Sequence, residues 1–428
     1  MQPHQADAAS PGPQRAGTGR LRAAFGILIA VGLLAYALSQ VPLEDRLRAG
    51  TGPDQVLLDV RLDLDGGRWR GNALSGSVTA VDTQPAEPAA WGGLRIGDRL
   101  ELEIEEVQSE GLVRGAVAGE SASWLELRPG LPSLLRTAEP LAFPASLATL
   151  ALATLLIATR WWRLLRALEC GTRWRNAMRI TWTSLFFNVA LPGLSGGDVA
   201  RAWIAVRGNP EKQEAALVSV AADRVFGLWA MTLVALIAVS LGGARFEALR
   251  VPVAIAAGGL SAGWLLYSFG PLGSWLTPER LARLPFGERL VQIEGAGGRL
   301  ARNTPLVGLA LVLSGLNHLA CALSIWLVAQ GLGSDLGFLQ VLVVSTVANT
   351  LSAIPVAPAG LGVGELLFGS LFELAGGSWA VGVATSLAWR LVLVGLGLLG
   401  GAGALLPGGR QLHRDFKSAA AAGKATTG

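Results

Sequence analysis

Six ionisable residues lie inside or beside otherwise apolar stretches of this 428-residue chain: Asp198, Arg201, Asp223, Arg224, Glu365 and Arg390. Because a charged group inside a membrane is costly, such residues usually mark a substrate path or a buried ion pair. The arginines are candidate ligands for a lipid phosphate, since a guanidinium forms two parallel hydrogen bonds with phosphate. The carboxylates of Asp198 and Glu365 are expected to cap half-helices and to pair with arginines when no lipid is bound.

Glycines precede both of these acids in the chain. Gly196 and Gly197 come before Asp198, and Gly360 and Gly362 come before Glu365. Glycine permits close backbone approach, and the free N–H groups and dipole at a helix N-terminus favour an anion. These glycines are therefore candidate parts of an anion-binding site.

Two asparagines, Asn188 and Asn349, are candidate hydrogen-bond donors to a headgroup or to the backbone. In a helix that begins near Gly197, Asp198 and Arg201 lie on one face. A structural alternative stays open, in which Asp198–Arg201 and Asp223–Arg224 are permanent ion pairs or cytoplasmic-interface residues that never contact substrate. His318 is expected to be packed and hydrogen-bonded rather than a proton relay.

Composition places these residues in an integral membrane protein. Hydrophobic residues make up 51% of the chain and charged residues 15%, whereas a soluble domain has about 25% charged residues. The 56 glycines suit close helix packing or broken helices. Two cysteines and three histidines argue against a disulfide framework and a metal site. We expect no cofactor, no direct use of ATP and no nucleic-acid partner.

Six apolar runs are long enough for the roughly 20 residues that a transmembrane helix needs. They cover residues 23–41, 141–159, 215–241, 251–270, 305–331 and 379–406. Arginine-rich stretches follow the second and fourth runs, and they indicate cytoplasm. The tails 1–22 and 407–428 are then cytoplasmic too, and residues 23–41 are read as an uncleaved anchor rather than a signal peptide.

Individual arginines also bear on this orientation. Arg160, Arg163 and Arg166 follow the second run and are expected to set the orientation and contact anionic headgroups. Arg245 and Arg250 do not fit this scheme, because it places their loop outside the cytoplasm.

Residues 42–140 form an acidic insert with 17 acidic and 10 basic side chains. Apolar and polar residues alternate over 56–65 and 100–105, which is typical of strands. The insert is therefore expected to be a small β-rich domain outside the cytoplasm.

Two apolar regions, 181–203 and 336–375, are interrupted by proline and clustered glycine, which leave backbone groups that lipid cannot satisfy. Both are read as re-entrant pairs of half-helices. Residues 193–198 (GLSGGD) and 360–365 (GLGVGE) look like copies, and Arg224 and Arg390 follow their acids by 26 and 25 residues. With the expected orientation this is an inverted repeat, an arrangement typical of transporters; chance similarity between glycine-rich segments is the alternative.

These motifs resemble the transmembrane, flippase-like region of lysylphosphatidylglycerol synthases. The resemblance covers about residues 141–406 and rests on Asn188, residues 191–193 (LPG), the GGD run with Arg201, Asp223-Arg224, residues 354–365 and Arg390. It implies movement of amino-acylated, glycosylated or other anionic-core lipids between leaflets. The acidic insert departs from the family pattern. About 22 residues follow position 406, too few for an aminoacyl-transferase domain, so we expect a stand-alone member that works beside a separate lipid-modifying enzyme.

The expected fold class is an all-α polytopic membrane protein with inverted repeats, two re-entrant broken helices and a β-rich insert. The expected function is a flippase without covalent chemistry in a bacterial-type cytoplasmic (inner) membrane. One alternative is a transferase that uses a polyprenyl-phosphate donor, with Asp63 and Asp65 in its first external loop. Another is a small-anion permease.

Overall fold

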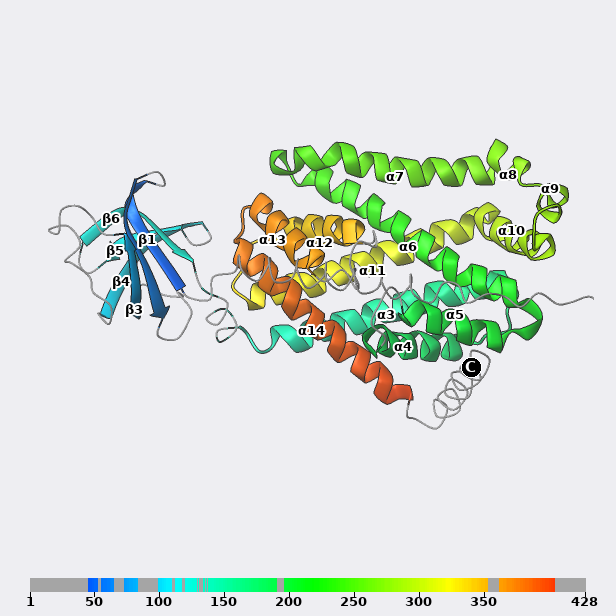
Figure 1. Cartoon of the computed structure of the whole chain (residues 1–428), viewed down its shortest axis with the longest axis horizontal. Helices are drawn as coiled ribbons and strands as arrows, with labels where there is room; N and C mark the ends of the chain where they lie inside the picture. The colour runs from blue at the N-terminus through cyan, green and yellow to red at the C-terminus, as the bar shows by residue number, and fades with distance from the viewer. Residues whose placement is uncertain are drawn as a thin grey trace, which may run out of the picture.

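The structure is a computed structural model that describes residues 45–52, 55–64, 73–83, 99–109, 112–117, 120–128, 130, 134, 136, 138–190, 196–352 and 362–404. Figure 1 shows a β-barrel at one end of an elongated helical bundle. The first predicted span (23–41), the tail 407–428, Asp65 and Gly360 lie outside the described residues.

The barrel has six antiparallel strands in chain order, and β1 closes the sheet by pairing with β6. The strands are β1 (Asp45–Gly52), β2 (Gln55–Leu64), β3 (Ala73–Thr83), β4 (Arg99–Ser109), β5 (Leu112–Val117) and β6 (Glu120–Arg128). Closure leaves no open sheet edge. The carboxylate of Asp45 accepts a hydrogen bond from the Gly130 N–H (2.6 Å), which ties the chain that leaves β6 to the start of β1.

The helical part begins with four helices in the order long, short, short, long: α3 (Ala142–Ala167), α4 (Trp174–Ala190), α5 (Gly196–Gly208) and α6 (Gln213–Leu241). The same order recurs in α11 (Thr304–Gly331), α12 (Phe338–Ser352), α13 (Val363–Ala375) and α14 (Trp379–Ala404). Between these groups lie α7 (Glu247–Ser268), α8 (Pro271–Trp275), α9 (Pro278–Ala282) and α10 (Gly287–Arg302). Two 3-10 turns, η1 (Pro210–Lys212) and η2 (Ala244–Phe246), precede α6 and α7.

Five of the described helical segments are long and apolar enough to cross a membrane. They are Ala142–Ala167, Pro210–Leu241, Ala244–Ser268, Thr304–Gly331 and Trp379–Gly401. Each overlaps one of the five predicted spans from residue 141 onwards. One boundary was predicted wrongly: α3 continues past 159 because Trp161, Leu164 and Leu165 extend its apolar face into the core, so Arg160 lies within the helix.

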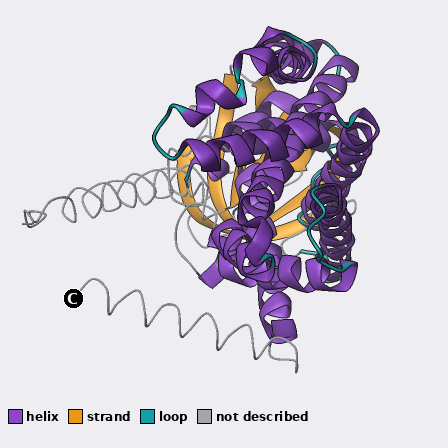
Figure 2. Cartoon of the chain, turned by 90° about the vertical axis from the view of Figure 1, so that its right-hand side faces the viewer, coloured by secondary structure: helices purple, strands orange, loops and turns teal. Residues whose placement is uncertain are grey.

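The two short-helix pairs point in opposite directions along the bundle (Figure 1). We call the end nearest the barrel the barrel end and the opposite end the α10 end; Figure 2 looks at the molecule from the α10 end, with the strands behind the helices. At the α10 end, Lys212 contacts the Glu169 carboxylate (2.9 Å), so the outer ends of α4 and α5 lie together there. At the barrel end, Arg245 donates to the Ala375 carbonyl (2.8 Å) beside the outer ends of α12 and α13.

The packing relates the two groups of helices. The helices α3 and α11 pack against each other, α6 packs against α12, and α14 packs against α4. Gly400 and Gly401 let α14 approach α4 closely, because an added Cβ would overlap Trp182 or Phe186. Each long fourth helix therefore crosses the first short helix of the other group.

Candidate functional site: two acid–arginine bridges and a buried charge triad

The first short pair places Asp198 in the opening turn of α5. The Asn188 side-chain oxygen accepts a hydrogen bond from the Gly197 N–H (2.8 Å), which satisfies one of the free donors of that turn. Gly197 is buried against α4, and an added Cβ would overlap the Ser184 carbonyl and Asn188. Glycine at position 197 therefore lets the two helices meet, and the Asn188 side-chain oxygen acts as an acceptor here.

Asp198 forms an ion pair with Arg224 of α6. The Arg224 side chain is 63% exposed and that of Asp198 is 18% exposed. An exposed guanidinium has N–H groups left over after binding one carboxylate oxygen, because it carries five donors in all. Arg224 therefore keeps exposed N–H donors that an incoming anion can reach.

The second short pair places Glu365 in the opening turn of α13. Gly362 precedes this helix with a φ of +79°, a conformation that favours glycine. One Glu365 carboxylate oxygen accepts from the Gly362 N–H (2.6 Å) and the other accepts from Arg390 Nε of α14 (2.5 Å). Glu365 thus caps its helix as expected and also bridges to α14.

The two bridges occupy equivalent places in their helix groups. In each, an acid in the first turn of the second short helix binds an arginine on the following long helix. A glycine directly before the acid is buried in both, and a Cβ on Gly364 would lie 2.8 Å from Arg390. The arginines differ in exposure, because Arg390 is 27% exposed and Arg224 is 63% exposed.

Behind the first bridge lies a buried triad of Arg160, Asp223 and Arg201, contributed by α3, α6 and α5. Arg160 Nε donates to one Asp223 oxygen (2.7 Å), and Arg201 Nη1 donates to the other (2.9 Å). Each of the three side chains is at most 6% exposed. The triad therefore carries one excess positive charge within the packed bundle.

Hydroxyl groups and an indole ring complete the surroundings of the triad. Arg160 also donates to Ser314 of α11, and Arg201 donates to Thr181 of α4 (2.8 Å). The Arg201 guanidinium stacks over the Trp161 ring, with 4.6 Å between its carbon and the ring centroid. Five helices thus meet at these side chains, and the triad holds α5 in place.

The structure corrects three sequence-based expectations about these charges. The alternative pairs Asp198–Arg201 and Asp223–Arg224 are wrong, because Asp198 binds Arg224 and Asp223 binds Arg201. Adjacent residues such as Asp223 and Arg224 point to different sides of a helix, and the packing of neighbouring helices decides which charges meet. Arg160, expected at the headgroups, is instead buried with Asp223; the apolar residues that follow it along α3 were the signal for this.

The remaining candidates fall in several places. Gly196 begins α5, and Asn349 is half-buried near the end of α12. The His318 ring is hydrogen-bonded to the Gly227 carbonyl (2.9 Å), which confirms the packed and hydrogen-bonded role expected for it. Asp63 belongs to β2 of the barrel. Arg245 and Arg250 each donate to a backbone carbonyl at the barrel end, which gives these two arginines a structural role there.

The α3–α4 connection lies beyond the spanning helices at the α10 end. The Lys212 ammonium, which is hydrogen-bonded to Glu169, holds the pKa of that exposed carboxyl below its usual value. Burial raises the pKa of the neighbouring Cys170 thiol, because an apolar surrounding disfavours the thiolate.

Long apolar helices that carry buried ion pairs define a multi-pass membrane protein. Residues 129–401, well over half of the chain, match the family described as the lysylphosphatidylglycerol synthase TM region. The chain belongs to this family, and the membership supports a function related to membrane lipids. A search of curated proteins found no match to this chain.

Proposed function

We propose that this protein is a membrane lipid transporter, a flippase that moves an anionic or modified lipid between leaflets without covalent chemistry. The observation that carries the proposal is the acid–arginine bridge made twice, on short-helix pairs that point in opposite directions. The amino-acylated or glycosylated lipid would be supplied by a separate lipid-modifying enzyme.

The first step of the mechanism is an exchange of partners. A lipid phosphate competes with the carboxylate of Asp198 or Glu365 for its guanidinium, and it offers the same planar, bidentate hydrogen bonding. The carboxylate receives the arginine again when the phosphate leaves, so the guanidinium always has an anionic partner. This makes each bridge a reusable binding position.

The second step links the two bridges. We interpret α3–α6 and α11–α14 as an inverted repeat, and the interruptions between α4 and α5 and between α12 and α13 as re-entrant breaks. One bridge then binds a headgroup that arrives from the α10 end, and the other binds a headgroup that arrives from the barrel end. The buried triad is the fixed part of this arrangement, since Asp223 satisfies both of its arginines away from any entering lipid.

We place the α10 end in the cytoplasm and the barrel outside it, in a bacterial-type inner membrane. Exposed arginines crowd the α10 end, among them Arg163, Arg166, Arg175 and Arg179, which fits the positive-inside rule. Arg245 and Arg250 at the barrel end donate to backbone carbonyls instead. The N- and C-terminal tails are then both cytoplasmic.

Reconstitution of the full chain into liposomes tests the function. Fluorescent phosphatidylglycerol and lysylphosphatidylglycerol report leaflet exchange when a membrane-impermeant reductant quenches the outer leaflet. We expect the wild type to accelerate exchange of at least one of them. Arg224→Gln and Arg390→Gln should each slow it roughly tenfold, because each removes charge-assisted hydrogen bonds to phosphate and about 1.4 kcal/mol corresponds to a factor of ten.

The matched control is Arg289→Gln, which removes the same charge from α10. Its side chain is 74% exposed and only approaches the Glu214 carboxylate at 4.0 Å, so exchange should be unchanged. Equal slowing in all three variants, or no acceleration of either lipid by the wild type, would refute the proposal. Uptake of a water-soluble anion without lipid exchange would identify a permease instead.

A further inference from the structure

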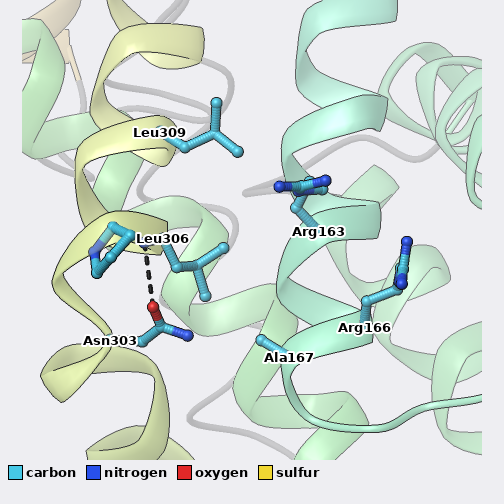
Figure 3. Close-up of a pocket in the computed structure, with 7 residues that line it drawn as sticks. Arg163, Arg166, Ala167, Asn303, Leu306 and Leu309 are labelled. Carbon is cyan, nitrogen blue, oxygen red and sulfur yellow. Dashed lines mark hydrogen bonds between the residues drawn. The ribbon is translucent and has the colours of Figure 1, made fainter.

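A second cationic feature lies at the α10 end, in a cavity of about 350 Å³ between the end of α3 and the start of α11. Figure 3 shows Arg163, Arg166 and Ala167 of α3 across from Asn303, Leu306 and Leu309. The volume is within the range of small-molecule sites.

Three groups lining this cavity can donate hydrogen bonds. Arg163 and Arg166 are exposed, and neither forms an ion pair with a carboxylate among the described residues. Arg166 stacks against Trp162, with 5.1 Å between its guanidinium carbon and the ring centroid, which limits its movement. The Asn303 oxygen accepts from the Leu306 N–H (3.2 Å) and caps α11, which leaves the amide nitrogen of Asn303 as the donor.

The other wall of the cavity is apolar. Leu306 and Leu309 project from α11 toward α3 in Figure 3. A free phosphate ion would gain nothing from leucine, whereas a phospholipid places its phosphate next to its acyl chains. The cavity lies at the end of two spanning helices, where lipid headgroups lie. Its cationic wall suits a lipid phosphate and its apolar wall suits the acyl chains next to that phosphate.

We propose that this cavity binds the headgroup of an anionic phospholipid, with its phosphate on Arg163 and Arg166 and its glycerol and upper acyl chains on Leu306 and Leu309. The site is separate from the two bridges and does not depend on lipid movement. Its position on α3 relates it to the triad, because Arg163 follows the buried Arg160 by one helical turn. The cavity is therefore a peripheral site on the same helix seam where Arg160 contacts Ser314.

Lipid retention by the intact, detergent-purified chain tests this proposal. Native mass spectrometry would count bound phosphatidylglycerol and phosphatidylcholine with identical acyl chains, added at equal concentration. We expect the wild type to retain phosphatidylglycerol preferentially. The double variant Arg163→Gln/Arg166→Gln should lower its occupancy at this site roughly tenfold, as expected for the loss of charge-assisted hydrogen bonds.

Two further variants distinguish lipid binding in this cavity from general attraction to the positively charged surface. Arg175→Gln/Arg179→Gln removes two exposed arginines of α4 at the same end of the bundle, and it should leave the preferential retention intact. Ala167→Trp keeps every charge but fills the cavity, so it should lower retention as much as the double arginine variant.

Three results would overturn the proposal: equal losses in the two double-arginine variants, full retention in Ala167→Trp, or displacement of the lipid by an equal concentration of inorganic phosphate. The last result would identify a site for the free ion. If lipid retention is lost but leaflet exchange is unchanged, the flippase proposal still stands. If leaflet exchange is lost but lipid retention is unchanged, the proposal for this cavity still stands.

Discussion

The buried triad makes a quantitative prediction for Asp223→Asn. This substitution removes the negative charge that serves two arginines whose side chains are 6% and 4% exposed. Removing one partner of a buried ion pair costs about 3–5 kcal/mol, because an uncompensated charge stays buried. Two guanidinium groups lose their counter-charge here, so we expect the upper part of that range.

Asp198→Asn is the matched comparison, because it makes the same chemical change on a bridge whose arginine is 63% exposed. Solvent-exposed pairs contribute about 0–1 kcal/mol, so this variant should unfold almost like the wild type. Unfolding in mixed micelles containing an anionic detergent, followed by tryptophan fluorescence, measures both free energies.

A triple variant tests the cause. Arg160→Met, Arg201→Met and Asp223→Leu together replace the whole triad by apolar side chains, a change that is often neutral or stabilising. We expect it to recover most of the stability lost in Asp223→Asn. If Asp223→Asn unfolds like Asp198→Asn, or if the triple variant is less stable than Asp223→Asn, the reasoning from burial is refuted.

Three further predictions concern packing, capping and thiol chemistry. Gly197→Ala should destabilise the protein by about 1–3 kcal/mol in the same assay, because its Cβ overlaps α4; Gly208→Ala, in open space on α5, should cost nothing. Glu365→Ala should destabilise more than Glu365→Gln, since glutamine can still cap α13 although it loses the charge opposite Arg390; equal losses would contradict a capping role. The Cys170 thiol, with its raised pKa, should react with iodoacetamide at pH 8.5 more slowly than free cysteine and speed up with rising pH; a rate equal to that of free cysteine would contradict its burial.

Much of the helical architecture could be predicted because membrane helices are encoded by local composition. Runs of about 20 apolar residues predicted the five described spans. The equivalence of Asp198 with Glu365, and of Arg224 with Arg390, was also readable from spacing alone, and the structure pairs each acid with its arginine.

The partners of the remaining charges could not be predicted. Arg160, Asp223 and Arg201 belong to three different helices, and only the packing of α3, α5 and α6 brings them together. The cavity beside Arg163 likewise depends on the approach of α3 to α11. Neither feature leaves a trace in residue spacing within one helix.

The amino-acid sequence by itself determined which segments are apolar, where helices must break and which ionisable residues stand within them, because each of these depends on a residue and its neighbours in the chain. The tertiary structure alone decided which carboxylate each arginine binds and whether that pair is buried or open. The physical reason is that electrostatic pairing depends on distance and desolvation, and helix packing sets both.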